Sequence, residues 1–317
     1  MLLLKRPRRI AALACVCFYA SVVASAQEVL PSLQAAVNRA MAGKDGTAVV
    51  LDVATSHVLA SYHPDVAARR VAFPGSTIKP FTLLALLQSG KINGQTALLC
   101  KRPLTIAGHK LDCPHPDTHH PLDPAEALAY SCNSYFTSVA TRLSPEQLQK
   151  AFVGHGFGSP TSLAKKEGTG SVALASTPEQ LQLQAIGEWG VKVTPLELVR
   201  AYRDLAILED NGGKAELQLV LSGLEGSTSY GMARLAQPKS AMRVAGKTGT
   251  SQAEECPWTH AWFAGWAPAV KPKIVLVIFL EKGTGGADAA GAARKIFAEY
   301  AEPAGTKPQN VAAKDVQ

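Results

Sequence analysis

The sequence has 317 residues, of which 47% are hydrophobic, and a formal net charge of +7. A chain of this length can bury a large core in one domain, or in one domain with an attached lobe. Four of its 32 basic residues lie before residue 27, so against 25 acidic residues the remainder carries only +3. Such a mild positive charge, without any run of five like charges, argues against a nucleic-acid partner.

The first 26 residues have the three parts of an export signal. An apolar run over 10–23 follows a basic end and precedes the small-x-small sequence Ala24-Ser25-Ala26. The basic residues are Lys5, Arg6, Arg8 and Arg9. The apolar run is shorter than the roughly 20 residues that span a bilayer. We therefore expect a signal peptide cleaved after Ala26, with an uncleaved membrane anchor as the alternative, and a protein exported to the periplasm or the extracytoplasmic face.

Hydrophobic periodicity predicts most of the secondary structure. Helical patterns cover 28–43 and much of 76–89, 122–142, 145–152 and 178–206, and an Ala-rich helix is expected over about 287–300. Two β-rich runs within GTAVVLDVATSHVLASY predict a hairpin that turns at Ala54-Thr55-Ser56. Three more strands are predicted in MRVAGKTGT, HAWFAGWAP and KIVLVIFLE.

Strands therefore lie near both ends of the chain, and helices lie between them. The economical fold is one α/β (α+β) domain over 27–302, in which both chain ends build one antiparallel sheet with flanking helices and a helical lobe. Residues 303–317 are expected to form a polar C-terminal tail.

Four cysteines remain after the signal segment, in a compartment where disulfides can form. Between Cys100 and Cys113 the sequence KRPLTIAGHKLD predicts a hairpin that turns around residues 106–108, which sets these two cysteines opposite each other. We expect a Cys100–Cys113 disulfide, and free buried thiols at Cys132 and Cys256.

Ser76 and Lys79 stand three residues apart in FPGSTIKPF, at a predicted helix start. This spacing sets them one turn apart on one face, where an amine with a lowered pKa could take the serine proton. The unpaired backbone N–H groups at a helix start can donate hydrogen bonds to an oxyanion. Pro80 is expected to push Lys79 away from helical geometry and to stiffen this turn. Alone, the Ser-x-x-Lys pair occurs often by chance.

Two further motifs accompany this pair. Ser131 and Asn133 are expected to project to one side of a short bend in the helical run over 122–142, where they could relay a proton and hold a substrate amide. The segment from Lys247 to Thr250 (KTGT) follows a strand pattern, and Gly249 would let another backbone approach closely. Ser-x-x-Lys, Ser-x-Asn and Lys-Thr-Gly in this order form the pattern of penicillin-binding proteins and serine β-lactamases.

The sequence resembles the transpeptidase domain of class B penicillin-binding proteins over roughly residues 45–300. The segments PGSTIKPFT, SCNSYF, VAGKTGTSQ and HAWFAGWAP carry the resemblance, together with AIGEWGVKVTPLELVRAYRDLA. It implies a β-lactamase/transpeptidase-like fold and a serine D,D-transpeptidase of peptidoglycan cross-linking that needs no cofactor. Peptidoglycan stem peptides would be its substrates, β-lactams its inhibitors, and cell-wall synthesis proteins its possible partners.

Position by position, the resemblance implies an acyl-enzyme on Ser76, which attacks the penultimate D-Ala carbonyl with Lys79 as the base. Ser131 would pass a proton to the departing D-Ala, and Asn133 would hold the substrate amide. The substrate carboxylate would meet the third motif, that is Lys247, Thr248, Gly249 and Thr250. The oxyanion would lie between the N–H groups of Ser76 and Thr250.

The sequence departs from the family at two places. A usual Gly-Gln-Gly is represented by residues 187–190 (GEWG), and a Gly-Thr-Ala step by residues 231–233 (GMA). These departures put partner contacts in doubt more than the nucleophile. A D,D-carboxypeptidase, a class D-like serine β-lactamase and a non-catalytic β-lactam sensor or scaffold remain alternatives. A class A β-lactamase would need an E-x-x-L-N loop between the second and third motifs, which the sequence lacks.

A metal site is a further alternative. Cys113-Pro-His115 and the pair His119-His120 have a spacing that could suit zinc. A Pro-rich loop with spare histidines is the preferred interpretation, so no metal site is expected.

Overall fold

The structure is a computed structural model that describes residues 31–210, 214–254 and 256–301. The predicted signal peptide, its cleavage site and the predicted tail over 303–317 lie outside the described residues. Within the described part, no helix combines the length and apolarity needed to cross a membrane.

One five-stranded antiparallel sheet forms the centre of the molecule, in the order β2-β1-β9-β8-β7. Its strands are β1 (Gly46–Asp52), β2 (Val58–Tyr62), β7 (Ala245–Gln252), β8 (Thr259–Ala267) and β9 (Ile274–Leu280). Strand β1 pairs along its whole length with β9, from Gly46 opposite Leu280 to Asp52 opposite Ile274. The prediction that both ends of the chain build one sheet is confirmed.

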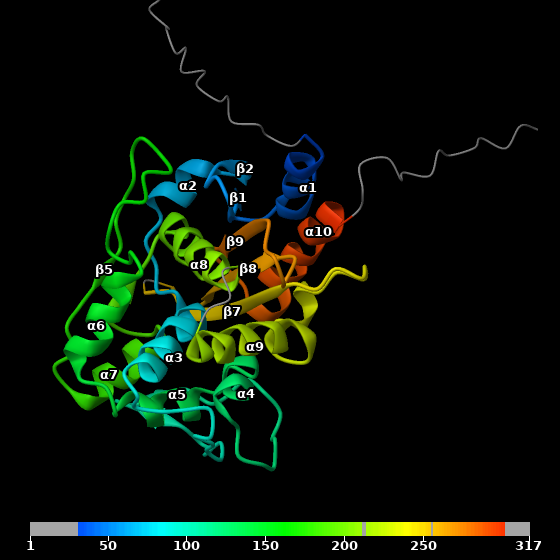
Figure 1. The fold of residues 1–317 in the computed structure, drawn as a ribbon. Helices are drawn as coiled ribbons and strands as arrows, with labels where there is room; N and C mark the ends of the chain where they lie inside the picture. Colours follow the sequence, from blue (N-terminus) through cyan, green and yellow to red (C-terminus); the bar gives the residue numbers. More distant parts are fainter. Residues whose placement is uncertain (1–30, 211–213, 255, 302–317) are drawn as a thin grey trace, which may run out of the picture.

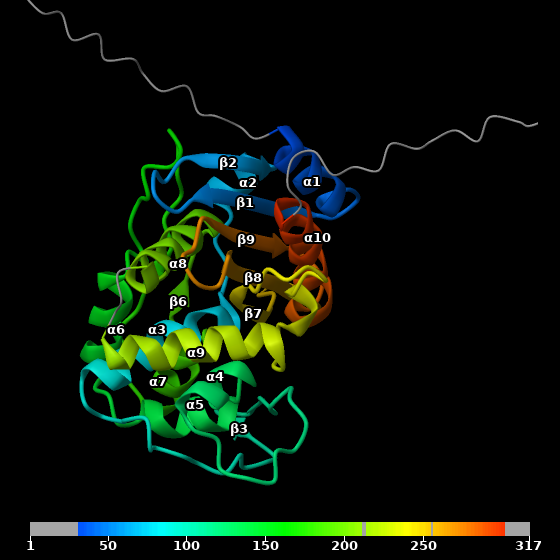
Figure 2. The same cartoon turned by 45° about the vertical axis from the view of Figure 1, so that its right-hand side comes forward.

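Helices cover both faces of this sheet (Figures 1 and 2). Helices α1 (Pro31–Met41) and α10 (Ala290–Ala301) pack on one face, and α8 (Pro195–Asp210) packs on the other. The strand β9 is buried throughout and reads as the continuous apolar run IVLVIFL, which is expected for a strand covered on both faces. In β1 the side chains alternate, with Val50 in one core cluster and Val49 in the other.

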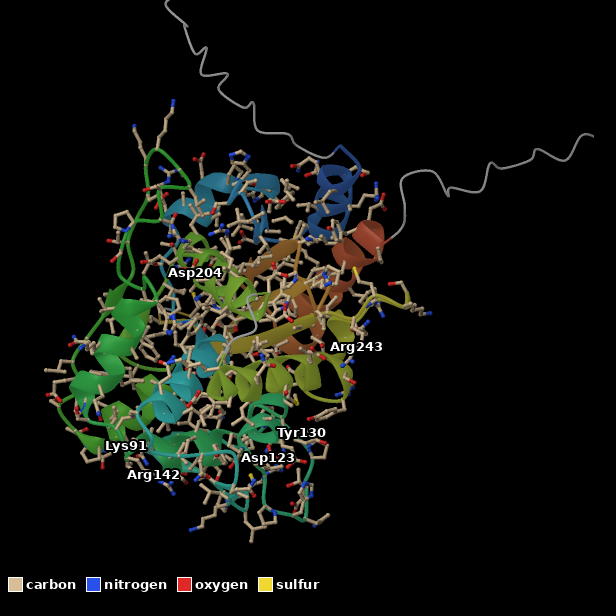
Figure 3. All side chains as sticks on the ribbon, in the orientation of Figure 1. Lys91, Asp123, Tyr130, Arg142, Asp204 and Arg243 are labelled. Atoms are coloured by element: carbon tan, nitrogen blue, oxygen red, sulfur yellow. The ribbon has the colours of Figure 1, made fainter. Side chains whose placement is uncertain are left out.

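A helical lobe extends from the β7 edge of the sheet (Figure 1). It contains α3 (Lys79–Gln88), α4 (Pro124–Ala129), α5 (Asn133–Ala140), α6 (Pro145–Gly154) and α7 (Pro178–Ala185), and α9 (Ala215–Ser229) packs between α4 and β7. Asp123 accepts a hydrogen bond from the Glu126 N–H and so caps the start of α4. Figure 3 shows Asp123 and Tyr130 at this end of the lobe.

Two predicted helical stretches are interrupted. The run over 122–142 breaks between α4 and α5, at Tyr130–Cys132. The run over 178–206 stops where Gly187 and Gly190 adopt positive φ angles of 81° and 66°, and the short strand β6 (Val191–Lys192) then pairs with β5 (Ser171–Val172). Helices α9 and α2 (Pro64–Arg69) were not predicted, whereas the hairpin of β3 (Thr105–Ile106) and β4 (His109–Lys110) was.

Candidate functional site

Ser76 lies in a 3-10 turn, Gly75–Ile78, which leads directly into α3. Gly75 has a φ of +52° and donates its N–H to the Gly187 carbonyl at 3.1 Å. A Cβ added to Gly75 would lie 2.7 Å from the Thr250 carbonyl oxygen, so no larger residue fits there. The turn that carries Ser76 is therefore held between β7 and the loop that follows α7.

Lys79 is completely buried, and its amine joins the first motif to the second. Its Nζ donates hydrogen bonds to the Ser131 carbonyl at 2.8 Å, to Ser131 Oγ at 3.2 Å and to Asn133 Oδ1 at 2.6 Å. Burial lowers the pKa of Lys79 from 10.5 to about 8. The structure thus has a lysine that is partly neutral near pH 7, next to two polar side chains.

The backbone of Lys79 differs from the expectation. Its φ of −57° and ψ of −34° are helical, although a residue before proline normally avoids this region. Pro80 occupies the first turn of α3, where a missing N–H costs little. The prediction that Pro80 pushes Lys79 out of helical geometry was wrong, because both side chains are buried in the helical lobe and tertiary packing outweighs the local preference.

The second motif occupies the break between α4 and α5. Ser131 has a φ of +56°, a left-handed conformation that is uncommon for serine and that occurs often at functional sites. Asn133 begins α5 and donates from Nδ2 to the Leu111 carbonyl at 3.0 Å. Its amide is thereby fixed between Lys79 and the loop after β4.

The third motif lies on β7, the edge strand next to the Ser76 turn. A Cβ on Gly249 would lie 2.5 Å from the Pro74 carbonyl oxygen, which explains why glycine stands at this close approach. Lys247 is fully buried and donates to the Thr248 carbonyl at 3.1 Å. Burial, aided by the nearby Lys79, holds the pKa of Lys247 well below its usual range.

The three motifs meet at one cavity of about 250 Å³. Its lining includes the predicted residues Ser76, Ser131, Asn133, Thr248 and Thr250. Lys79 is buried and contacts two of these residues, Ser131 and Asn133, whereas Lys247 and Gly249 are buried on β7 beside Thr248 and Thr250. The cavity therefore presents hydroxyl and amide groups, with two buried lysines beside them that supply positive charge or accept protons.

Glu188 also lines this cavity and was not predicted as a site residue. It also lines an adjoining cavity of about 510 Å³, where its neighbours include Lys110 and Trp189. Burial raises the pKa of Glu188 to about 7, against the opposing effects of the Gln252 N–H and Lys79. The available signal was the acidic residue in the segment 187–190, which was interpreted only as a departure that affects partner contacts.

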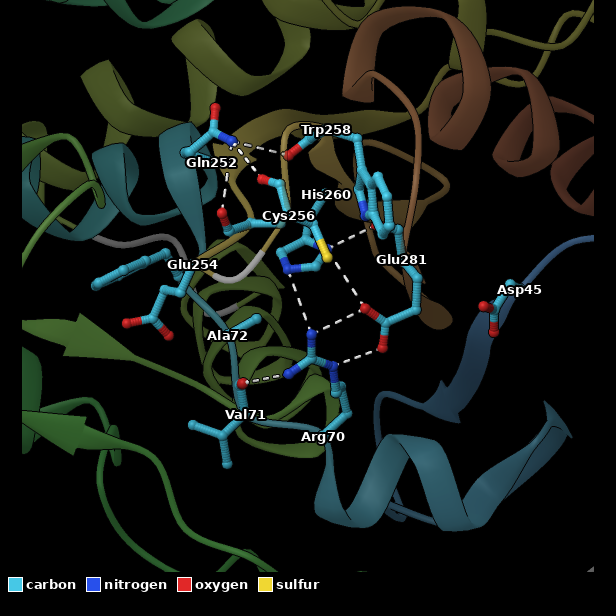
Figure 4. Close-up of a pocket in the computed structure, with 12 residues that line it drawn as sticks. Asp45, Arg70, Val71, Ala72, Gln252, Glu254, Cys256, Trp258, His260 and Glu281 are labelled. Carbon is cyan, nitrogen blue, oxygen red and sulfur yellow. Dashed lines mark hydrogen bonds and ion pairs between the residues drawn. The ribbon is translucent and has the colours of Figure 1, made fainter. Parts of the chain in front are cut away.

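A separate polar cavity of about 390 Å³ lies beyond the far end of β7 (Figure 4). Arg70 and Glu281, which both line it, form an ion pair, and His260 Nδ1 lies 2.8 Å from the Glu281 carbonyl oxygen. None of the predicted catalytic or substrate-binding residues lines this cavity.

The cysteines form a cluster that extends the predicted pair. The sulfur atoms of Cys100 and Cys113 lie 3.4 Å apart, and Cys132 Sγ lies 3.6 Å from Cys113 Sγ. All three are free thiols in the structure, so the Cys100–Cys113 disulfide stays a prediction. Cys256 is half-exposed rather than buried as predicted, because it lies in the loop between β7 and β8 at the rim of a cavity.

A possible metal-binding set is also centred on these cysteines. Ligand atoms of Cys100, Cys113, Cys132 and His115 all lie within 4.8 Å of one another. His119 and His120 are exposed, outside this cluster. The structure thus groups His115 with the three thiols, whereas the set suggested by the sequence combined Cys113 and His115 with His119 and His120.

A family match and two curated relatives identify the same kind of protein. Residues 46–302 match the family described as "Penicillin binding protein transpeptidase domain". The chain is 26% identical to the peptidoglycan D,D-transpeptidase FtsI of Buchnera aphidicola, over 84% of this chain and 54% of that protein. It is 24% identical to the peptidoglycan D,D-transpeptidase MrdA of Acinetobacter baumannii, over 84% and 52%. The chain thus spans about half the length of these curated relatives.

Solved structures have the same fold. Pseudomonas aeruginosa PBP2, solved in complex with WCK 5153, superposes with a TM-score of 0.74 at 23% identity, covering 91% of this chain and 78% of that one. The D,D-transpeptidase domain of a peptidoglycan glycosyltransferase from Eggerthella lenta gives 0.74 at 22% identity, over 86% and 81%. With the family match over most of the sequence, the chain belongs to the penicillin-binding protein transpeptidase domain family.

Proposed function

We propose that this protein is an exported serine D,D-transpeptidase that cross-links peptidoglycan stem peptides through an acyl-enzyme on Ser76. The observation that carries the proposal is the buried Lys79, which bonds to Ser131 and Asn133 directly behind the cavity that Ser76 lines. A lysine in this position can serve a nucleophile only when its pKa is lowered, and burial lowers it to about 8.

The proposed first half-reaction forms an ester between Ser76 and the stem peptide. Ser76 Oγ attacks the penultimate D-Ala carbonyl carbon, and neutral Lys79 takes the hydroxyl proton. The peptide C–N bond then breaks, and Ser131, hydrogen-bonded to Lys79, passes the proton to the nitrogen of the leaving D-Ala. The N–H groups of Ser76 and Thr250 would stabilise the oxyanion.

The substrate is held by the remaining predicted residues. Asn133 is fixed by two hydrogen bonds and would orient the substrate amide. Thr248 and Thr250 line the cavity and would bind the terminal carboxylate, with the charge of Lys247 behind them. A neighbouring stem-peptide amine then attacks the ester carbonyl carbon and gives a proton to neutral Lys79. The bond to Ser76 Oγ breaks as this proton passes to the oxygen, and the cross-link forms.

A D,D-carboxypeptidase is a second candidate function, and Glu188 is the observation that favours it. This carboxyl lines the same cavity as Ser76, with a pKa raised by burial to about 7. A carboxylate there can take a proton from water as the water oxygen attacks the acyl carbonyl carbon. The ester bond to Ser76 then breaks and the proton passes from Glu188 to Ser76 Oγ, which releases the shortened peptide and restores the Ser76 hydroxyl.

The two functions are separated by their products. A stem peptide that ends in D-Ala-D-Ala is incubated with the full chain, with and without an acceptor amine, and the products are identified by mass spectrometry. A transpeptidase gives the amine-linked product when acceptor is present, whereas a carboxypeptidase gives mainly the peptide shortened by one D-Ala. Absence of D-Ala release under both conditions would contradict both functions.

Two further alternatives are tested with β-lactams and one variant. Penicillin should label Ser76 in a burst without sustained hydrolysis, whereas rapid multiple turnover of a chromogenic cephalosporin would indicate a β-lactamase. Ser76→Ala should abolish D-Ala release. A sensor or scaffold would release no D-Ala in either form of the chain.

A further inference from the structure

Three cysteines and one histidine lie together directly behind the second motif. Cys132 stands between Ser131 and Asn133 and forms the N-cap of α5. Cys113 and His115 follow the β3–β4 hairpin, and Cys100 precedes it. Their four candidate ligand atoms lie within 4.8 Å of one another, so three separate chain segments converge on one point.

The spacing of the sulfur atoms suits a metal. In a tetrahedral zinc site with Zn–S bonds of about 2.3 Å, two sulfurs lie about 3.8 Å apart. Here the Cys113–Cys132 distance is 3.6 Å and the Cys100–Cys113 distance is 3.4 Å. Small shifts of side chains would therefore complete the coordination.

His115 supplies an independent observation. The residue is only 2% exposed, and its Nε2 is buried without a hydrogen-bond partner among the described residues. Its Nδ1 lies 2.7 Å from the Pro116 carbonyl oxygen and 3.1 Å from Arg102 Nη2. The contact with the carbonyl oxygen is made when the proton is on Nδ1, and in that tautomer Nε2 carries a lone pair. A buried nitrogen that lacks a partner is costly, and a metal ion would remove this cost.

Each sulfur also accepts a hydrogen bond from an N–H group, which is the environment of a metal-bound thiolate. Ser134 N–H donates to Cys113 at 3.3 Å, and Tyr135 N–H donates to Cys132 at 3.4 Å. The Arg102 guanidinium donates to Cys100 at 3.4 Å. Because one divalent ion with three thiolates carries a net charge of −1, this guanidinium is a suitable counter-charge.

We propose that Cys100, Cys113, His115 and Cys132 form a tetrahedral zinc site that fixes the second motif against the hairpin loop. Three thiolates and one imidazole favour Zn²⁺ among the common divalent ions. The site is structural, because all four positions are filled by protein. It replaces the Cys100–Cys113 disulfide, since one sulfur cannot serve both roles.

Two hydrogen bonds already join the segments that carry these cysteines to the second motif, so the proposed metal would also affect the cavity. Asn133, next to Cys132, bonds to the Leu111 carbonyl, and the Lys101 N–H, next to Cys100, bonds to Ser134 Oγ at 2.9 Å. Zinc would hold these same three segments together. Its removal should loosen Ser131 and Asn133 while the sheet stays folded.

The test uses the full chain, purified without chelator and with a non-thiol reductant. We expect about one zinc per chain by elemental mass spectrometry. Replacement by Co²⁺ should give the intense visible bands and the sulfur-to-cobalt charge-transfer band of a tetrahedral thiolate site. Cys100→Ser and His115→Ala should each lose at least about tenfold in zinc affinity in a chelator competition.

The chain offers matched controls for both variants. Cys256→Ser removes a half-exposed cysteine and His120→Ala an exposed histidine, both outside the cluster, so both should keep full zinc content. The Co²⁺ spectrum of the unmodified chain tests the site without any variant that could fail to fold. The proposal is overturned if the unmodified chain takes up neither Zn²⁺ nor Co²⁺, or if a second preparation made without reductant carries a Cys100–Cys113 disulfide instead of metal. Equal zinc affinity in Cys100→Ser and the controls would also overturn it.

Discussion

The lowered pKa of Lys79 predicts a specific pH dependence for acylation of Ser76. With a pKa of about 8, the neutral fraction of this amine is about 1% at pH 6, about 10% at pH 7 and about half at pH 8. The acylation rate should therefore rise about tenfold from pH 6 to 7 and about fivefold from pH 7 to 8, and then level off. At the ordinary pKa of 10.5, it would still rise about tenfold per pH unit at pH 9.

The assay measures the second-order rate of labelling by a fluorescent penicillin, at constant ionic strength, between pH 6 and 9. Glu188 also titrates near the middle of this range, at about 7, so Glu188→Gln is the control that removes its contribution. The variant should show the same rise and plateau, moved to slightly lower pH, because the Glu188 carboxylate raises the pKa of Lys79. A rate that keeps rising tenfold per unit above pH 8, or a flat profile in both proteins, would refute Lys79 as the base.

Three further changes follow from the geometry of the site. Gly249→Ala should lower the acylation rate by about 100-fold, because the new Cβ would lie 2.5 Å from the Pro74 carbonyl oxygen and would displace the Ser76 turn. The melting temperature should also fall, and an unchanged rate would contradict this close approach. Glu188→Gln should slow hydrolysis of the penicillin adduct by about tenfold, while its acylation rate stays within twofold of that of the unmodified chain. Equal adduct lifetimes in the two proteins would show that this carboxylate takes no part in deacylation. Pro80→Ala should reduce the acylation rate but have a smaller effect on the free energy of unfolding, because Pro80 restricts the first turn next to Lys79. A large loss of stability with a normal acylation rate would contradict this role of Pro80.

The fold could be predicted from the sequence where periodicity was strong. The run IVLVIFL and the hairpin near the N-terminal end are confirmed as β9 and as β1 with β2. The break of the helical run at Ser131 was predicted from polar residues within an apolar pattern. Helix α9 was missed, because its segment ELQLVLSGLEGSTS contains two glycines that favour a loop in isolation. Packing of α9 against α4 and β7 outweighs that preference.

The sequence motifs allowed the residues of the site to be predicted, but they did not indicate the contacts that depend on tertiary packing. The order of the three motifs indicated which side chains meet, and five of the eight predicted catalytic and substrate-binding residues line one cavity. Which groups Lys79 contacts depends on tertiary packing, and no local rule predicts helical geometry for a residue before proline. The position of Glu188 depends on the contact between Gly187 and Gly75, which joins segments more than 100 residues apart.

The full arrangement of Cys100, Cys113 and Cys132 also depends on tertiary packing that sequence spacing does not show. The hairpin was predicted, but its register pairs Thr105 with Lys110, which differs by two residues from the pairing that would set Cys100 opposite Cys113. Cys132 joins the cluster only through the start of α5, and sequence spacing carries no information about that approach.

If Ser76 is the nucleophile of an acyl-enzyme, penicillin should form a covalent adduct with this residue, and peptide mass spectrometry can locate that adduct. The full chain and Ser76→Ala are treated with penicillin, digested, and examined by peptide mass spectrometry. We predict that the peptide containing Ser76 gains the mass of one intact penicillin in the unmodified chain, and that the variant gains none. Labelling at another residue, or no labelling of the unmodified chain, would contradict the account.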